Sequence, residues 1–82
     1  MTKSELDTIL EKKHFLCKND VWFNHKTDYT ITVYGEHLIT ITILTPYSSI
    51  SRYILIEDLS VKKLEKIIKK MIEKLKELNK EL

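Results

Sequence analysis

Residues 29–44 read YTITVYGEHLITITIL, two runs of alternating side chains separated by the chain's single glycine. Alternation with a period of two is typical of a strand that buries one face and exposes the other. We therefore predict strands over 29–34 and 38–44, joined as an antiparallel hairpin. The fold depends on which face of this hairpin carries the isoleucines.

The length of the turn decides which side chains share a face. A two-residue loop would set Val33 opposite Leu38 and mix the two faces, since a one-residue slip inverts every side chain. A three-residue loop over 35–37 sets Val33 opposite Ile39 instead, and the β-branched apolar residues of the hairpin then share one face. We predict this register, or a longer loop of the same parity.

Further elements flank the hairpin. Apolar residues at helical spacing predict a helix over 2–17, with Cys17 as a buried thiol at the end of its apolar face. Residues 21–24 form either a short extra strand or a segment that seals this helix against the core. Residues 52–57 alternate again and predict a third strand. Apolar residues in steps of three and four predict a long C-terminal helix over about 60–81.

The predicted order is α-β-β-β-α, an α+β fold in which a small antiparallel three-stranded sheet carries two helices on one face. Eighty-two residues correspond to one domain, so we expect residues 1–82 to form a single unit. One glycine, one proline and 43% hydrophobic residues exclude disorder and low-complexity repeats.

No group of residues in the sequence predicts catalysis or a cofactor. His14, His25 and His37 are at least eleven residues apart along the chain, and His14 with Cys17 makes only a single pair of possible ligands, which does not fit the convergent, paired spacing of a metal site. A single glycine excludes the glycine-rich phosphate loops. We therefore expect no enzyme activity, no metal and no cofactor. The lone cysteine, and the lack of a signal-like or membrane-spanning run, favour a cytoplasmic protein without membrane contacts.

The sheet face opposite the isoleucines is the first candidate contact surface. If both helices cover the isoleucines, the threonines and tyrosines of the strands stay uncovered. Tyrosine is a favoured residue at the energetic centres of protein interfaces. We predict contacts with a protein partner at Tyr34, Thr40, Thr42 and Tyr53.

Lysines on the last helix are the second candidate. The formal net charge is only +2, but eight lysines lie among residues 58–82. A row of cations neutralises phosphates, whereas interleaved glutamates also fit an ordinary solvated face. The candidate contacts with nucleic acid or an acidic partner are Lys62, Lys63, Lys66, Lys69 and Lys70, with His37.

The predicted order resembles the double-stranded-RNA-binding domain. Residues 35–37 read Gly-Glu-His where that family has a Gly-Pro-x-His loop, and residues 62–66 read Lys-Lys-Leu-Glu-Lys where it has Lys-Lys-x-x-Lys. The resemblance implies that His37 enters the RNA minor groove and that the lysines contact the backbone. The loop proline and the family's glycine-rich stretch before the last helix are missing here.

In size and style the chain resembles phage and mobile-element inhibitors, including anti-CRISPR proteins, which are often small intracellular domains without catalytic motifs. This resemblance implies an inhibitor of a host nucleic-acid enzyme. We predict a non-catalytic protein-binding module that acts by stoichiometric occupation of a partner surface. RNA binding by the basic face of the last helix is the alternative.

The end of the last helix is a candidate for self-association. Leu75, Leu78 and Leu82 continue the apolar seam at heptad spacing, where the helix should overhang the sheet. This seam predicts either a homodimer through the C-terminal helix or packing against the first helix.

Overall fold

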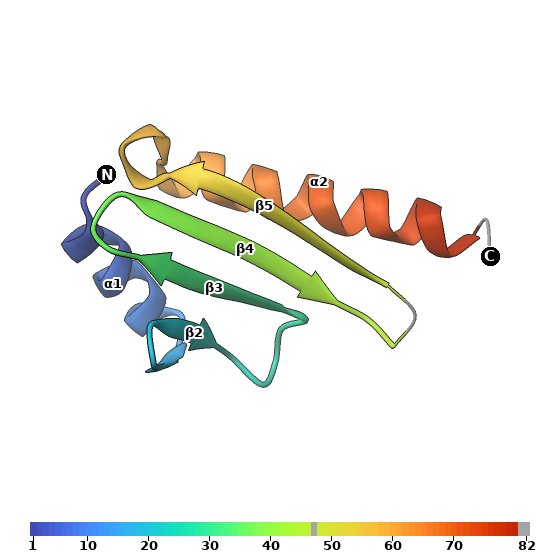
Figure 1. Ribbon diagram of the computed structural model, residues 1–82, viewed down its shortest axis with the longest axis horizontal. Helices are drawn as coiled ribbons and strands as arrows, with labels where there is room; N and C mark the ends of the chain where they lie inside the picture. The colour runs from blue at the N-terminus through green and yellow to red at the C-terminus, as the bar shows by residue number, and fades with distance from the viewer. Residues whose placement is uncertain (47, 81–82) are drawn as a thin grey trace.

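The computed structural model describes residues 1–46 and 48–80. Its elements are α1 (Lys3–Lys12), β1 (Leu16–Lys18), β2 (Val21–Phe23), β3 (Tyr29–Tyr34), β4 (Leu38–Leu44), β5 (Ser49–Leu55), a 3-10 turn (Ile56–Asp58) and α2 (Val61–Lys80). The five strands form one antiparallel sheet in the order β1-β2-β3-β4-β5 (Figure 1). The fold is α+β, as predicted, but the sheet is larger than expected.

The β3–β4 hairpin has the predicted three-residue register. Val33 lies opposite Ile39, and Ile31 lies opposite Ile41. Gly35 has φ +66°, a backbone conformation that L side chains rarely adopt. The one glycine of the chain therefore stands where the turn requires it.

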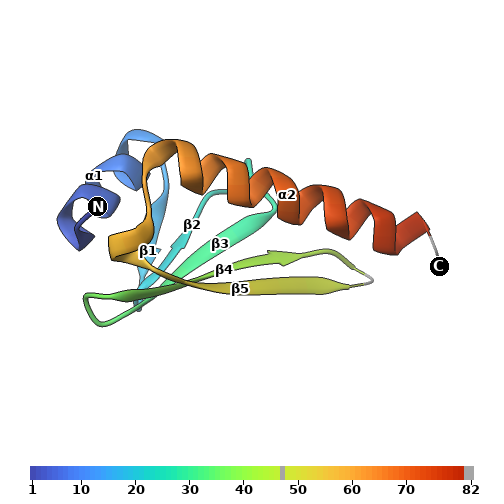
Figure 2. The same ribbon diagram turned by 90° about the horizontal axis from the view of Figure 1, so that it is seen from above.

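Both helices lie on the same side of the sheet (Figure 2). The isoleucines of β3 and β4 are buried in the core. The largest fully buried side chains come from α1, β3, β4 and the 3-10 turn, and α2 closes the core with a stripe at helical spacing. The core residues of α2 are Leu64, Ile67, Ile68, Met71 and Leu75. Ser60 caps this helix, since its Oγ accepts a hydrogen bond of 3.2 Å from the backbone N–H of Lys63.

The prediction of a helix over 2–17 is wrong at its C-terminal end. The helix ends at Lys12, and the chain then forms a short hairpin in which Cys17 lies opposite Trp22. Asn19 and Asp20 both have positive φ (53° and 63°), as a two-residue turn with the twist of a β-hairpin requires. Cys17 is exposed on the outermost strand, not buried as predicted.

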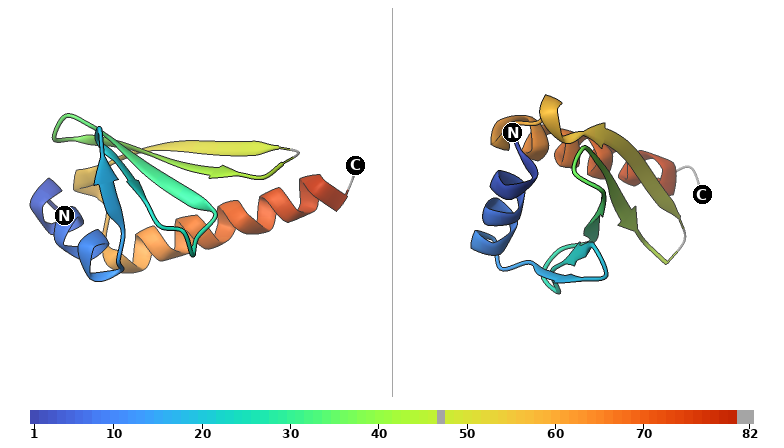
Figure 3. Two further views of the ribbon diagram at one scale, coloured as in Figure 1. Left: turned by 90° about the horizontal axis from the view of Figure 1, so that it is seen from below. Right: turned by 60° about the vertical axis from the view of Figure 1, so that its left-hand side comes forward.

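The strand predicted over 52–57 is displaced. It runs over Ser49–Leu55, and residues 56–58 form a 3-10 turn. It begins earlier because the β4–β5 hairpin is tight: the Thr45 N–H donates to the Ser48 carbonyl oxygen at 2.8 Å. With β1 and β2, the sheet therefore has five strands rather than three. Figure 3 shows the strands fanning out as the sheet twists.

In the described part of the chain, no helix combines the length and the apolar character needed to span a membrane.

Strand β4 provides a test of this core. Ile41 is fully buried on β4, whereas Leu44 on the same strand is exposed. Ile41→Ala should lower the free energy of unfolding by about 2–5 kcal/mol because it leaves a cavity under α2. Leu44→Ala, the matched control, should change it by less than about 0.5 kcal/mol. Urea denaturation measures both, and equal losses would contradict this arrangement.

The thiol of Cys17 reports on the first hairpin. In the native protein it should react completely with a thiol-specific disulfide reagent, because β1 leaves it exposed. The chain unfolded in urea gives the full amplitude for comparison. A thiol that reacts only in denaturant would place Cys17 in the core and would contradict the strand.

Candidate functional site

The sheet surface turned away from the helices carries most of the large exposed apolar side chains. We call this surface the open face. Of the seven such residues in the described part of the chain, five lie on it by strand register. They are Leu16, Tyr34, Leu44, Tyr53 and Leu55. The open face therefore carries exposed apolar side chains, among threonines and serines, that the fold itself leaves without a cover.

Two tyrosines lie close together on this surface. The rings of Tyr34 and Tyr53 lie 6.4 Å apart between centroids and are tilted by 30°. Their exposed fractions are 49% and 67%. Leu38 joins Tyr34 to Leu55 in one row across three strands. Aromatic and aliphatic groups thus adjoin one another at the end of the open face nearest the β3–β4 turn.

The two predicted threonine contacts differ in accessibility. Thr40 is only 6% exposed, because it lies on the interior strand β4 between Thr32 and the large ring of Tyr53. Thr42 is half-buried, and its Oγ1 lies 3.2 Å from the Ser51 Oγ, within hydrogen-bonding distance. The structure therefore exposes Tyr34 and Tyr53 to solvent, leaves Thr42 partly accessible and buries Thr40.

A second surface lies between β5 and α2. It is a groove of about 500 Å³, which we call the cationic groove. It is lined by Arg52, Ser60, Lys62, Lys63, Lys66, Ile67 and Lys70. Among the residues described as lining it, five are cations and none is a carboxylate. Arg52 reaches it because this residue lies opposite Ile41, on the α2 side of β5.

The structure divides the lysines predicted as one contact row. Lys62, Lys63, Lys66 and Lys70 line the cationic groove, but Lys69 lies on the opposite flank of α2, beside Glu65 and Glu73. Arg52, which lies on the strand that precedes α2, was not singled out from the sequence. The signal that places it on the α2 side of β5 was its spacing of two residues from both Ile50 and Ile54.

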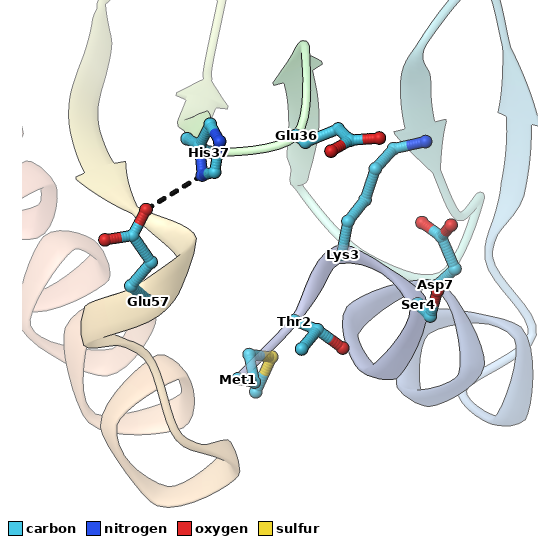
Figure 4. A pocket seen from close by; sticks show the side chains of 8 residues that line it. All are labelled: Met1, Thr2, Lys3, Ser4, Asp7, Glu36, His37 and Glu57. Atoms are coloured by element: carbon cyan, nitrogen blue, oxygen red, sulfur yellow. Dashed lines mark ion pairs between the residues drawn. The ribbon is translucent and has the colours of Figure 1, made fainter.

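His37 does not belong to the cationic groove. It lines a depression of about 390 Å³ near α1, and its Nδ1 forms an ion pair of 2.8 Å with Glu57 Oε1. Figure 4 shows His37 turned toward Glu57 and away from Lys3. No group of three or more histidine, cysteine or acidic side chains in the described chain can hold a metal ion.

Tyr29 is a titratable group that the fold perturbs. It is half-buried on β3, and its ring lies 5.5 Å from that of Phe15. Burial raises the pKa of the Tyr29 hydroxyl above its ordinary value of 10.0, and the negative charge of Glu65 raises it further. The fold therefore favours the neutral phenol.

The predicted self-association seam is divided between core and surface. Leu75 is 4% exposed and belongs to the core, whereas Leu78 is exposed. Leu82 lies outside the described residues. The last turn of α2 extends beyond the start of β5, as Figures 1 and 2 show. Of these three leucines, only Leu78 is therefore shown to be exposed. Dimerisation through this helix stays a prediction.

A scan of family models, a search of curated proteins and a search of solved structures each found no match to this chain.

Tyr29 gives a prediction for alkaline pH. Because its pKa is higher in the folded state, its contribution to stability is present below about pH 10 and declines as pH rises through the folded pKa. Between about pH 8 and about pH 11, wild type should therefore lose more unfolding free energy than Tyr29→Phe. Urea denaturation at both pH values measures this difference. Equal losses would contradict the raised pKa of Tyr29, since the two proteins differ only in that hydroxyl.

Proposed function

We propose that this protein is a non-catalytic protein-binding module that occupies a surface of its partner stoichiometrically. The observation that carries the proposal is the exposed cluster of Tyr34, Tyr53 and Leu55 on the open face. The isoleucines of the sheet that form the core lie on the other face, beneath the helices. The cluster therefore adds little burial to the fold and offers apolar area to a partner.

Tyrosine suits this role physically. Its ring contributes a large apolar area at a low cost in side-chain entropy, and its hydroxyl finds a hydrogen bond at the rim of an interface. The half-buried Thr42 and the exposed Ser51 next to the cluster supply polar groups. An apolar centre with a polar surround is the usual anatomy of a protein interface.

The narrower hypothesis is a phage or mobile-element inhibitor of a host nucleic-acid enzyme, similar to anti-CRISPR proteins. It stays a prediction from the size and style of the sequence, and so does the cytoplasmic location. Both require the partner to be identified.

The open face can be tested by affinity capture from nuclease-treated extract. A purified complex of fixed stoichiometry, measured by light scattering, is the expected result. Tyr34→Ala combined with Tyr53→Ala should weaken the complex at least about tenfold, because interface tyrosines often contribute more than about 1 kcal/mol each. Val61→Ala removes an exposed apolar side chain of α2 and should change little.

Two outcomes would contradict the open face as the binding surface. One is the recovery of nucleic acid alone. The other is a complex that the double tyrosine variant binds as tightly as wild type.

RNA binding remains the second candidate, favoured by the cationic groove. The five-stranded sheet departs from the α-β-β-β-α order on which the family resemblance rested, and His37 lies in another depression. Duplex RNA should then bind through Lys62, Lys63, Lys66 and Lys70, with a steep loss of affinity as salt rises. Absent or salt-independent binding at low salt would exclude this candidate.

A further inference from the structure

Strand β5 is an edge of the sheet. It pairs with β4 on one side, and no other described strand lies on its second side. Its seven residues, Ser49–Leu55, pair with β4 in continuous register without a bulge. The strand contains no proline, and Arg52 is its only charged residue. It therefore lacks most of the devices that protect natural edges from strand addition.

The hydrogen-bond pattern shows which backbone groups of β5 point outward. Ile56 N–H donates to the His37 carbonyl and Thr45 N–H to the Ser48 carbonyl, each at 2.8 Å. Both pairs are in register with the β4–β5 ladder, in which hydrogen-bonded pairs alternate with pairs that are not. The even-numbered residues of β5 therefore bond to β4. The backbone groups that point away from the sheet belong to Ser49, Ser51, Tyr53 and Leu55.

A strand added at this edge would lie between the two surfaces described above. Its side chains would alternate between them, because successive residues of a strand point to opposite faces. Those on the open face would adjoin Tyr53 and Leu55, which are apolar and exposed. Those on the other face would adjoin Arg52 and the lysines of the cationic groove. The edge thus matches a strand with apolar and acidic residues in alternation.

We propose that β5 accepts an extended acidic segment of a partner protein as a sixth strand, with its carboxylates in the cationic groove. This inference rests on the proposed protein-binding function and names the chemistry of the partner. Main-chain hydrogen bonds supply affinity in this mode of recognition, and alternate side chains supply specificity. The charge of the groove selects carboxylates over neutral or basic strands.

Charge also selects against the other occupants. A second copy of this chain paired through β5 would bring two cationic grooves together, and like charges are destabilising at such short range. RNA would satisfy the lysines, but it would leave the outward amides of Ser51 and Tyr53 without partners in a strand ladder. An acidic segment satisfies the cations, the amides and the apolar rim together.

The probe is a labelled peptide of alternating glutamate and valine, followed by fluorescence anisotropy at low salt. A peptide of alternating lysine and valine should not bind. Lys66→Glu with Lys70→Glu should weaken the glutamate peptide at least about tenfold, since each reversal turns an attraction into a repulsion. Lys69→Glu with Lys76→Glu makes the same change in net charge on the opposite flank and should weaken it less than about threefold.

A second pair of variants tests the backbone of β5. Ser51→Pro removes an outward N–H and leaves the bonds to β4 in place, so peptide binding should be lost. Ser51→Ala loses the same hydroxyl but keeps the N–H, and it should bind like wild type. If Ser51→Pro does not fold, hydrogen exchange on wild type gives the same information. Saturating peptide should slow exchange at Ser51 and Tyr53, but not at Arg52.

The inference is overturned if exchange at Ser51 and Tyr53 does not change at saturation. It is also overturned if the peptide does not bind while duplex RNA binds equally well to wild type and to Ser51→Pro. A dimer that forms through β5, with a second copy of the chain at the edge, would overturn it as well. A further outcome is a complex with a partner protein that the double tyrosine variant weakens but that Ser51→Pro and the charge reversals at Lys66 and Lys70 leave unchanged. This result would refute strand addition but would still support the proposed function. Peptide binding without any tyrosine-dependent complex would refute binding through the open face.

Discussion

The burial of the isoleucines of β3 and β4 beneath α2 is the constraint on which the rest of the structure depends. The three-residue turn at Gly35 sets Ile31 opposite Ile41, so that both point to the helices. A different turn parity would move these side chains to solvent and leave the stripe of α2 without a partner. In a domain of 82 residues the core is necessarily small, so the loss of these contacts would remove much of it.

This one-sided core explains why the candidate surfaces lie where they do. A sheet covered on one face leaves its other face to solvent, and an antiparallel meander leaves an edge at each end. The edge at β1 is short, whereas the edge at β5 is seven residues long and lies between Tyr53 and the lysines of α2. The fold needs neither the open face nor the outer side of β5 for its own burial. Both are therefore free to serve recognition.

The parts of the candidate site that depend only on the alternation of side chains along a strand could be predicted from the sequence. Alternation along β3 and β5 is enough to place Tyr34 and Tyr53 on the same uncovered face, and the structure brings their rings together. Parity could not show that Thr40 is buried, because its exposure depends on the size of cross-strand neighbours and on the twist of the sheet. The lysines of α2 share a helix, but the rotation of that helix over the sheet determines which of them reach Arg52.

By itself, the sequence determined that there are two helices and three long strands, and it determined the register of the β3–β4 hairpin. Each of these depends on the spacing of apolar residues along a short stretch of chain. The tertiary structure alone decided where the first helix ends. The spacing of Leu6, Leu10 and Cys17 is compatible with a helix, but the pairing of β1 with β2, and of β2 with β3, places Cys17 on an exposed strand. The tertiary structure also decided that Arg52 lies beside the lysines of α2, because only the burial of the core between β5 and α2 brings the strand and the helix side by side.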